Sequence, residues 1–388
     1  MVSVLVTEVT PGAAECVRAM LSAMQDVEVL GYPRDGLEAV QMAVQLRPDV
    51  LLVPEKLAGM PGSEVCEFTA VAAPEVATVM MCEKDDAVAL RRAMCHGARG
   101  VITPTTSSEE IGMLLTGVKE FAKHTSSDRL DRITDPSSMP QTISLVSSRD
   151  GVGKSTLATN LATGLAQRFP GQVVLVDLCG QFGSAELLLN VKPHGNIVDL
   201  AGFVHEMDQE LVDTFLATHP SSLRVLVGGR KPDPAWIDAL SVGFVSSLLA
   251  LLRGKFRFVF CDLPAIVWPG SLYAVSRSQL CLVVASLWNV TEVHEVAALV
   301  ETLIPDYMPP ERLRLVVNRA SNRDWFSEED VQNATGHGVW HTVPNDTTNV
   351  FAAANEGAPV VITKPTAPFA KGVLALGDKI VKECQAAA

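Results

Sequence analysis

Residues 143–156 read ISLVSSRDGVGKST, a short apolar segment that runs into a glycine-rich loop. A helical pattern over residues 156–169 follows at once. This order of strand, loop and helix is the context that a phosphate-binding loop requires. Gly151 and Gly153 let the backbone approach an anion and aim N–H groups at it, and the start of the helix adds its positive dipole end. The stretch therefore predicts a phosphate site on an α/β fold.

The side chains of this loop supply what a nucleoside triphosphate needs. Lys154 provides a mobile cation for the β- and γ-phosphates, Ser155 a hydroxyl for Mg²⁺, and Thr156 a group on the α-phosphate side. Two later apolar strands each end in a carboxylate, Asp177 and Asp262. We expect Asp262 to hold a Mg²⁺-bound water, and Asp177 either to contact Mg²⁺ waters or Lys154 or to cap a turn. Lys154, Asp177 and Asp262 are the candidate catalytic groups, with ATP and Mg²⁺ as the predicted cofactors.

The composition describes a well-buried globular chain that is long enough for two domains. Of 388 residues, 48% are hydrophobic and 19% are charged, and the formal net charge is −13. This acidic balance disfavours nucleic acid and anionic lipid as partners. The 8 cysteines include no Cys-x-x-Cys pair, which is typical of reduced thiols in a cytoplasmic protein. No apolar stretch reaches the ~18–20 residues that a membrane span needs.

The chain consists of two α/β halves joined by a polar segment. Residues 1–124 contain five apolar strand patterns that alternate with amphipathic helices, as a flavodoxin-like doubly wound domain requires. Residues 125–140 are rich in Ser, Asp and Pro, and we expect them to form a linker. Residues 141–388 show a second alternation of strands and helices. The predicted fold class is therefore α/β, with two doubly wound parallel sheets.

The second half resembles the ParA/MinD family of deviant-Walker P-loop ATPases over nearly all of residues 141–388. The motifs that carry the resemblance stand in the family's order: Arg149–Thr156, Asp177-Leu178-Cys179, Asp262-Leu263-Pro264, Val317-Asn318-Arg319, Pro344-Asn345-Asp346 and Asn355-Glu356-Gly357-Ala358-Pro359. The resemblance implies that the phosphates are surrounded by Arg149, Asp150, Gly151, Val152, Gly153, Lys154, Ser155 and Thr156. It also implies that Asn318 reads adenine and that Arg319, Pro344 and Asn345 lie near the base.

Three departures from the family pattern concern hydrolysis more than binding. The family's signature lysine reaches across a homodimer to the partner's phosphates, and here it is Arg149, which keeps the charge but has a different geometry. Asp150 replaces a glycine and adds an acid beside the loop. Cys179 stands where the family has the Asp that positions the attacking water, and a thiol does not orient water as a carboxylate does. We therefore expect ATP to be bound by a homodimer and hydrolysed slowly or not at all.

Residues 1–124 resemble a response-regulator receiver domain. The resemblance rests on the runs Arg47-Pro48-Asp49-Val50-Leu51-Leu52-Val53, Met60-Pro61-Gly62 and Gly97-Ala98-Arg99-Gly100. The groups that such a domain needs for phosphorylation are replaced. Glu8-Val9 stand for the acidic pair, Pro54 for the acceptor Asp and Cys82 for the hydroxyl, while the lysine position falls near Pro104. We therefore expect a phospho-dead domain that serves as a docking or dimerising surface.

A phospho-dead receiver fused to a deviant-Walker ATPase resembles the TadZ/CpaE family of Flp (Tad) pilus-assembly proteins. The segment Val176–Gly183 adds to this resemblance. It implies a cytoplasmic ATP-binding homodimer, concentrated at a cell pole, that recruits pilus and secretion components through its receiver-like domain.

Two other functions fit the same motifs. One is an active ParA/MinD-like regulatory ATPase that controls the position or number of a surface structure such as the flagellum. The other is a chemical enzyme on the same architecture, such as dethiobiotin synthase, for which the sequence shows no dedicated set of catalytic residues. The C-terminal run 369–381 has apolar residues at helical spacing but no strongly basic face, which favours a helix packed on the core over one that binds a membrane.

Overall fold

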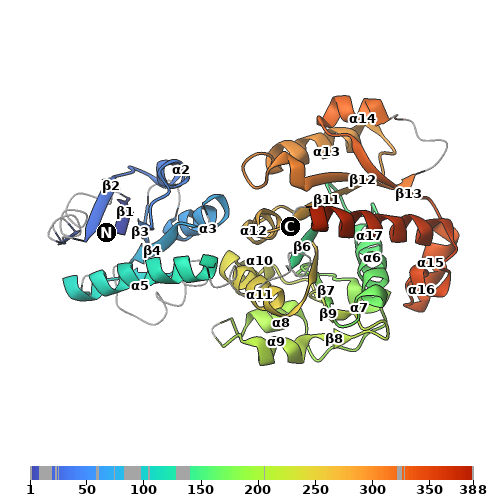
Figure 1. Cartoon of the computed structure of the whole chain (residues 1–388), viewed down its shortest axis with the longest axis horizontal. Helices are drawn as coiled ribbons and strands as arrows, with labels where there is room; N and C mark the ends of the chain where they lie inside the picture. Colours follow the sequence, from blue (N-terminus) through green and yellow to red (C-terminus); the bar gives the residue numbers. More distant parts are fainter. Residues whose placement is uncertain are drawn as a thin grey trace. The chain divides into compact units, whose positions relative to one another are not determined.

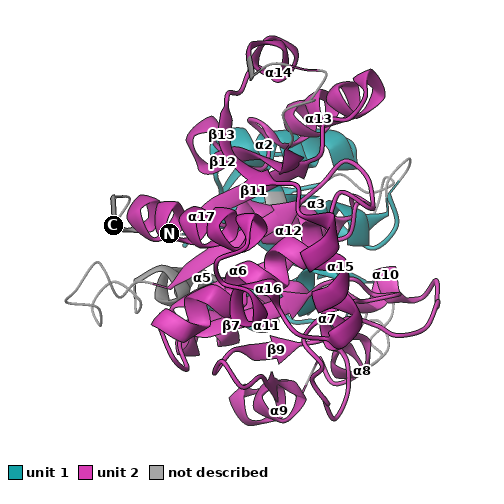
Figure 2. Ribbon diagram, turned by 90° about the vertical axis from the view of Figure 1, so that its right-hand side faces the viewer, with its two compact units in different colours: residues 1–134, 241–244 teal, residues 135–240, 245–388 magenta. Residues whose placement is uncertain are grey.

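The computed structural model describes residues 2–7, 20–21, 24, 26–57, 61–73, 75–82, 98–103, 105–127, 140–204, 206–320, 326 and 328–386. The chain divides into two compact units, which Figure 2 colours separately. One unit holds residues 1–134 with 241–244, and the other holds 135–240 with 245–388.

The first unit contains a five-stranded sheet in the order β2-β1-β3-β4-β5, with every neighbouring pair parallel. This order is that of flavodoxin-like doubly wound domains, so the predicted fold class is confirmed for this half. The strands are β1 (Val2–Val6), β2 (Val27–Gly31), β3 (Val50–Pro54), β4 (Ala77–Met81) and β5 (Gly100–Ile102), and the described helices are α2 (Gly36–Leu46), α3 (Gly62–Ala72) and α5 (Ser108–Ser127).

Two cores flank this sheet because successive strand side chains point to opposite faces. One core contains Leu51 and Val53 with residues of α2 and α3, and the other contains Val50 and Leu52 with residues of α5. A parallel sheet buried on both faces reads as a continuous apolar run, which is why β3 was visible in the sequence.

Several features expected in this half lie outside the described residues. They are the parts of the predicted alternation of strands and helices that fall on residues 8–19 and 83–97, and the positions of Glu8, Val9 and Pro104. Among the described positions, Pro54 is the last residue of β3, and Cys82 directly follows β4. Of the expected linker 125–140, only 125–127, which end α5, and 140 are described, so its boundaries stay a prediction.

The second unit contains an eight-stranded sheet in the order β13-β12-β11-β6-β10-β7-β9-β8. Its strands are β6 (Gln141–Val146), β7 (Val173–Asp177), β8 (Ala217–Thr218), β9 (Arg224–Leu226), β10 (Phe258–Asp262), β11 (Leu280–Ala285), β12 (Leu313–Ala320) and β13 (Val339–Pro344). All pairs are parallel except β8 with β9, which is antiparallel. The sequence did not predict β8, because two residues carry no periodic pattern.

Helices connect these strands, and α6 follows the P-loop directly (Figure 1). The described helices of this unit are α6 (Lys154–Arg168), α7 (Ala185–Leu188), α8 (Ile197–Ala201), α9 (Gln209–Phe215), α10 (Trp236–Ala239), α11 (Val242–Lys255), α12 (Pro269–Ser276), α13 (Val290–Leu303), α14 (Glu328–Thr335), α15 (Thr347–Glu356), α16 (Val360–Thr363) and α17 (Pro368–Ala386). The parallel doubly wound sheet predicted for this half is confirmed.

The last helix, α17, packs against α6 and β13 (Figure 1). Its apolar side chains Phe369, Val373, Leu376 and Ile380 are buried in the main core. The prediction of a core-packing helix is therefore confirmed. Within the described parts of the chain, no helix combines the length and apolar character needed to cross a membrane.

Candidate nucleotide-binding site

The P-loop backbone takes the shape that its two glycines permit. Strand β6 is buried along its whole length and delivers the chain to the loop, and α6 begins at Lys154. Gly151 and Gly153 both have φ of 85°, a left-handed conformation that costs glycine little. Between them, Val152 is 2% exposed and anchors the loop in the main core. The P-loop backbone therefore turns tightly around the buried side chain of Val152.

Lys154 and Asp262 form a buried ion pair at the start of α6. The Nζ atom of Lys154 lies 2.6 Å from Oδ1 of Asp262, and the two side chains are 7% and 1% exposed. Burial alone would lower the pKa of Lys154, but the attraction of the neighbouring groups together, Asp262 foremost and with its hydrogen bond, holds that pKa above the ordinary lysine value. The lysine is therefore a fixed cation beside the loop.

The second carboxylate oxygen of Asp262 is available for a cation. Oδ2 is buried and has no hydrogen-bond partner within the described residues. An orphaned carboxylate oxygen next to a phosphate loop suits Mg²⁺, a hard cation that prefers oxygen ligands and keeps several of its waters. Ser155, in the first turn of α6, brings a hydroxyl from the adjacent element. These residues fit the metal that the motif implies, and bound Mg²⁺ would neutralise phosphate charge.

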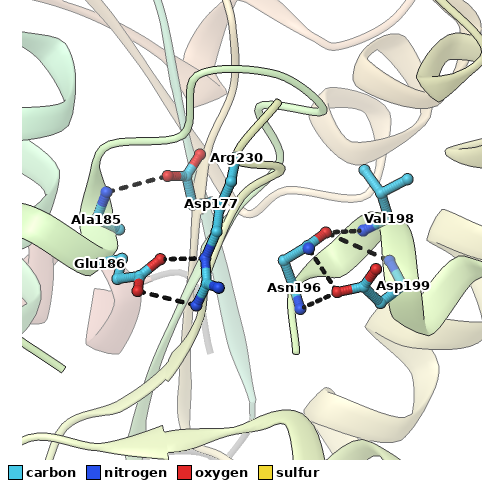
Figure 3. Close-up of polar contacts among 7 residues, drawn as sticks. All are labelled: Asp177, Ala185, Glu186, Asn196, Val198, Asp199 and Arg230. Carbon is cyan, nitrogen blue, oxygen red and sulfur yellow. Dashed lines mark hydrogen bonds and ion pairs between the residues drawn. The ribbon is translucent and has the colours of Figure 1, made fainter. Parts of the chain in front are cut away.

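Asp177 holds the loop that follows β7. It lies level with Asp262 on the neighbouring strand. Its Oδ1 accepts a hydrogen bond from the backbone N–H of Cys179 at 3.1 Å, and its Oδ2 accepts one from the N–H of Ala185 at 3.1 Å (Figure 3 shows the second). Burial, reinforced by the charge of Asp262, raises the pKa of Asp177 to about 6. Both oxygens cap backbone amides, which corresponds to the turn-capping alternative for this residue.

Cys179 is a half-buried thiol in that loop. Burial, with the negative charges of Asp177 and Asp262, raises the pKa of Cys179 far above its ordinary value. The thiol therefore stays protonated at neutral pH. A protonated thiol is not a general base and does not orient water by accepting its hydrogen bonds as a carboxylate does.

The loop after β7 is fastened to the loop after β9. The N–H of Gly229 donates to the carbonyl of Cys179 at 2.8 Å, and the N–H of Gly183 donates to the carbonyl of Gly229 at 2.8 Å. Arg230 adds a bidentate ion pair with Glu186 on α7, with nitrogen–oxygen distances of 2.7 and 2.9 Å (Figure 3). The loop that carries Cys179 is therefore tied at several points.

The same region is held from the side of α8. Asn196 starts that helix in a capping box with Asp199: its Oδ1 accepts from the N–H groups of Val198 and Asp199, and its own N–H donates to Asp199 Oδ2 (Figure 3). The N–H of Ile197 donates to the carbonyl of Val227, the residue that directly follows β9. The β9 loop is thus positioned from two directions.

Arg149, which replaces the signature lysine, is paired within its own chain. Its Nε and Nη2 atoms both lie 2.7 Å from Oε2 of Glu295 on α13. The hydrogen bond from Arg149 lowers the pKa of Glu295. Asp150, the next residue, is exposed to solvent. Its carboxylate is therefore hydrated.

Asn318 reaches the P-loop from β12. Its side chain is 3% exposed, and its Nδ2 donates to the backbone carbonyl of Val152 at 2.8 Å. Its Oδ1 is buried without a partner among the described residues. The next residue, Arg319, has φ of 61° and places its guanidinium 5.3 Å from the ring centre of Trp288.

The residues predicted to lie near the base, apart from Asn318 and Arg319, lie at the end of β13 or directly after it, and β13 is the strand that neighbours β12 in the sheet. Pro344 ends β13, and the N–H of Asn345 donates to Ala320 at the end of β12. The side-chain oxygen of Asn345 accepts a hydrogen bond from the hydroxyl of Thr347 at 2.8 Å. These contacts hold the loop after β13 beside the loop after β12.

Sequence reasoning missed several residues that build this site. They include Glu186, Arg230, Trp288, Glu292 and Glu295. Glu292 is 1% exposed and accepts hydrogen bonds from both the N–H and the hydroxyl of Ser286. Its position three residues after the capping residue Asn289 is a helix-start spacing that could have drawn attention to it. The other residues carry no local signal.

A parallel sheet that feeds a two-glycine loop, a buried lysine and a strand-terminal carboxylate defines a P-loop nucleotide-binding protein. Residues 143–360 match the CbiA model, described as the CobQ/CobB/MinD/ParA nucleotide binding domain. This match spans more than half of the chain, which therefore belongs to that family.

Relatives and solved structures agree with this assignment. The chain is 25% identical over 241 residues to a putative septum site-determining protein MinD of Tupiella akineta, covering 60% of this chain and 74% of the relative. It is 25% identical over 235 residues to the septum site-determining protein MinD of Synechocystis, and this match covers 58% of this chain and 83% of the relative. The fold is similar to a ParA family ATPase from Chlorobium tepidum, with a TM-score of 0.56 and 18% identity. The match covers 62% of this chain and 98% of the other. The fold is also similar to the MinD cell division ATPase of Pyrococcus furiosus, with a TM-score of 0.53 and 23% identity. That match covers 63% of this chain and 99% of the other.

Proposed function

We propose that this protein is an ATP-binding assembly factor that hydrolyses ATP slowly or not at all and uses the nucleotide as a switch. The observation that carries the proposal is the contrast between two parts of one site. The Lys154–Asp262 pair, with a spare carboxylate oxygen, supports binding of a Mg²⁺–nucleotide complex. The group beside it that would position water is the protonated thiol of Cys179. A site that binds the nucleotide but lacks a carboxylate to position water favours a protein controlled by bound ATP over one that turns ATP over.

The setting we propose is a Tad (Flp) pilus secretion system, as in the TadZ/CpaE family. Support comes from the pairing of this ATPase domain with a flavodoxin-like unit in which the acceptor position, at the end of β3, is Pro54. A proline cannot carry a phosphoryl group, so we propose that this unit docks pilus and secretion components. In this proposal the protein is cytoplasmic and reaches a cell pole, or the inner face of the membrane, through these partners.

We also propose that the protein forms a homodimer across the nucleotide face. The loops after β7, β10 and β11 border the P-loop, since their strands neighbour β6 or β10 in the sheet. They expose large apolar side chains, namely Phe182, Ile266, Val267, Trp288 and Val290. Trp288 is 50% exposed and Val290 67%. Apolar groups gathered beside a site are typical of an interface, and a structural neighbour from Aquifex aeolicus was solved as a MinC:MinD complex.

A second candidate is an active regulatory ATPase that controls the position or number of a surface structure such as the flagellum. The observation that favours it is the presence of Lys154, Ser155 and Asp262 in one place. The matched relatives are named for the placement of the division septum, which is a positioning role. Steady-state turnover separates the two candidates, since the switch proposal requires a rate far below that of active ParA/MinD proteins.

Titration with a fluorescent ATP analogue in the presence of Mg²⁺ tests the binding on which both candidates depend. The wild type should bind, Lys154→Ala should bind at least about tenfold more weakly, and Lys192→Ala, which changes an exposed lysine, should match the wild type. Equal binding by the wild type and Lys154→Ala would contradict the proposal.

Light scattering with ATP and Mg²⁺ should show a dimer, and a monomer under these conditions would contradict the nucleotide-face dimer.

A further inference from the structure

Asn318 and Val152 join two segments that are 166 residues apart in the chain. The side-chain Nδ2 donates to the Val152 carbonyl at 2.8 Å, and both residues are nearly fully buried. The amide nitrogen must face this carbonyl, since the opposite orientation would place two acceptors against each other. The bond is therefore a specific tie between β12 and the middle of the P-loop.

This tie fixes the orientation of a peptide group in the phosphate loop. A trans peptide is planar, and its C=O and N–H point in opposite directions. The Val152 carbonyl belongs to the same peptide as the N–H of Gly153. When Asn318 holds the carbonyl, it also sets the direction of that N–H, which is one of the donors of the loop. It also keeps the partial negative charge of the carbonyl on the side of Asn318.

The loop needs such a tie because its own residues leave it loosely specified. Gly151 and Gly153 flank Val152, and glycine loses more conformational freedom on ordering than any other residue. A Cβ atom added to Gly153 would lie 2.6 Å from Nδ2 of Asn318. The close approach of this amide therefore depends on the glycine, and the mobility of the glycine is limited by the amide.

We propose that Asn318 is a positioning residue for the phosphate loop, acting through the Val152 carbonyl whether or not a base is bound. This inference rests on the proposed binding of Mg²⁺–triphosphate at the loop. It adds a role to the adenine contact that the family resemblance implies for the same residue. The Oδ1 atom of Asn318 has no hydrogen-bond partner among the residues that the structure describes, so it can accept a hydrogen bond from a bound base.

Inorganic tripolyphosphate separates the two roles, because it carries the phosphates without base or sugar. With Mg²⁺ present, calorimetry should show that Asn318→Leu weakens tripolyphosphate binding by about tenfold, the scale of one buried hydrogen bond, and weakens ATP binding by at least as much. Asn318→Ala is the second variant if leucine prevents folding, and a circular dichroism melt checks each variant. The control Asn333→Ala, which changes an exposed asparagine on α14, should leave tripolyphosphate binding unchanged. Loss of ATP binding alone would make Asn318 a base reader only and overturn the inference.

Hydrogen–deuterium exchange tests the same inference without any ligand. In the free protein, amides of residues 150–156 should exchange at least about tenfold faster in Asn318→Leu than in the wild type or Asn333→Ala, because one restraint on the loop is gone. Unchanged exchange would overturn the inference. If the wild type failed to bind tripolyphosphate, the proposed function would be contradicted, and the exchange result would decide the role of Asn318 by itself.

Discussion

The Nζ atom of Lys154 lies 2.6 Å from Oδ1 of Asp262, and this ion pair is almost completely buried. The pair joins the first turn of α6 to the end of β10, and Asp177 lies level with Asp262 on the next strand. The buried cation of Lys154 thus ties the start of α6 to the end of β10 through Asp262, while Asp177 bonds backbone amides of the loop that follows β7.

Replacing Lys154 by methionine should destabilise the free protein by roughly 3 kcal/mol or more, because it leaves Asp262 buried without a counter-charge. The double variant Lys154→Met/Asp262→Asn should recover part of that loss. Urea unfolding in the absence of nucleotide measures both. If the double variant were no more stable than Lys154→Met, the ion pair would not be the source of the effect.

Replacing Cys179 by aspartate should raise steady-state ATP hydrolysis by at least about tenfold, because a carboxylate can accept hydrogen bonds from the attacking water. The loop already holds residue 179 through its N–H and its carbonyl, so the new side chain starts from a fixed backbone. Cys179→Ser is the matched control and should stay at the wild-type rate. A wild-type rate in Cys179→Asp as well would show that the cysteine does not limit hydrolysis.

Gly229→Ala should disrupt the junction between the β7 and β9 loops. A Cβ atom at this position would lie 2.0 Å from the carbonyl oxygen of Gly180, a clash with backbone that no side-chain movement relieves. We expect a loss of about 3 kcal/mol or more in the free energy of unfolding. Gly254→Ala, on α11 with open space around it, should instead be neutral or stabilising by up to about 1 kcal/mol. Equal melting temperatures for the two variants would contradict the tight junction.

Asp177 should make stability fall as pH rises. Its folded pKa is about 6, against an ordinary value of 3.8, so between these values the folded protein holds a proton that the unfolded chain has released. The contribution of Asp177 is therefore largest below about pH 4 and is lost as pH rises through 6. Urea midpoints measured from pH 4 to 7 without nucleotide or Mg²⁺ should show this slope in the wild type. The slope should be smaller in Asp177→Asn, and identical slopes would refute the assignment.

Much of the fold could be read from local patterns. The apolar run at β3 and the strand–loop–helix sequence around Gly151 and Gly153 are local signals, because burial of both sheet faces and glycine-dependent turns leave a mark within a few residues. The two-residue strand β8 left no such mark. The sequence likewise could not decide whether Asp177 contacts the metal site or caps a turn. Its partner is the backbone N–H of Ala185, and every residue except proline has such a group, so the residue type carries no signal.

The sequence by itself determined the two α/β units, the phosphate loop and the residues Lys154, Asp177, Cys179 and Asp262 at strand and helix ends. Only the tertiary structure decided what these residues touch. It paired Arg149 with Glu295, placed Asn318 against the carbonyl of Val152, and left one oxygen of Asp262 without a hydrogen-bond partner in the part of the chain that the structure describes. The physical reason is that secondary structure follows from short-range periodicity, whereas hydrogen bonds and ion pairs between distant segments depend on how the sheet and helices pack.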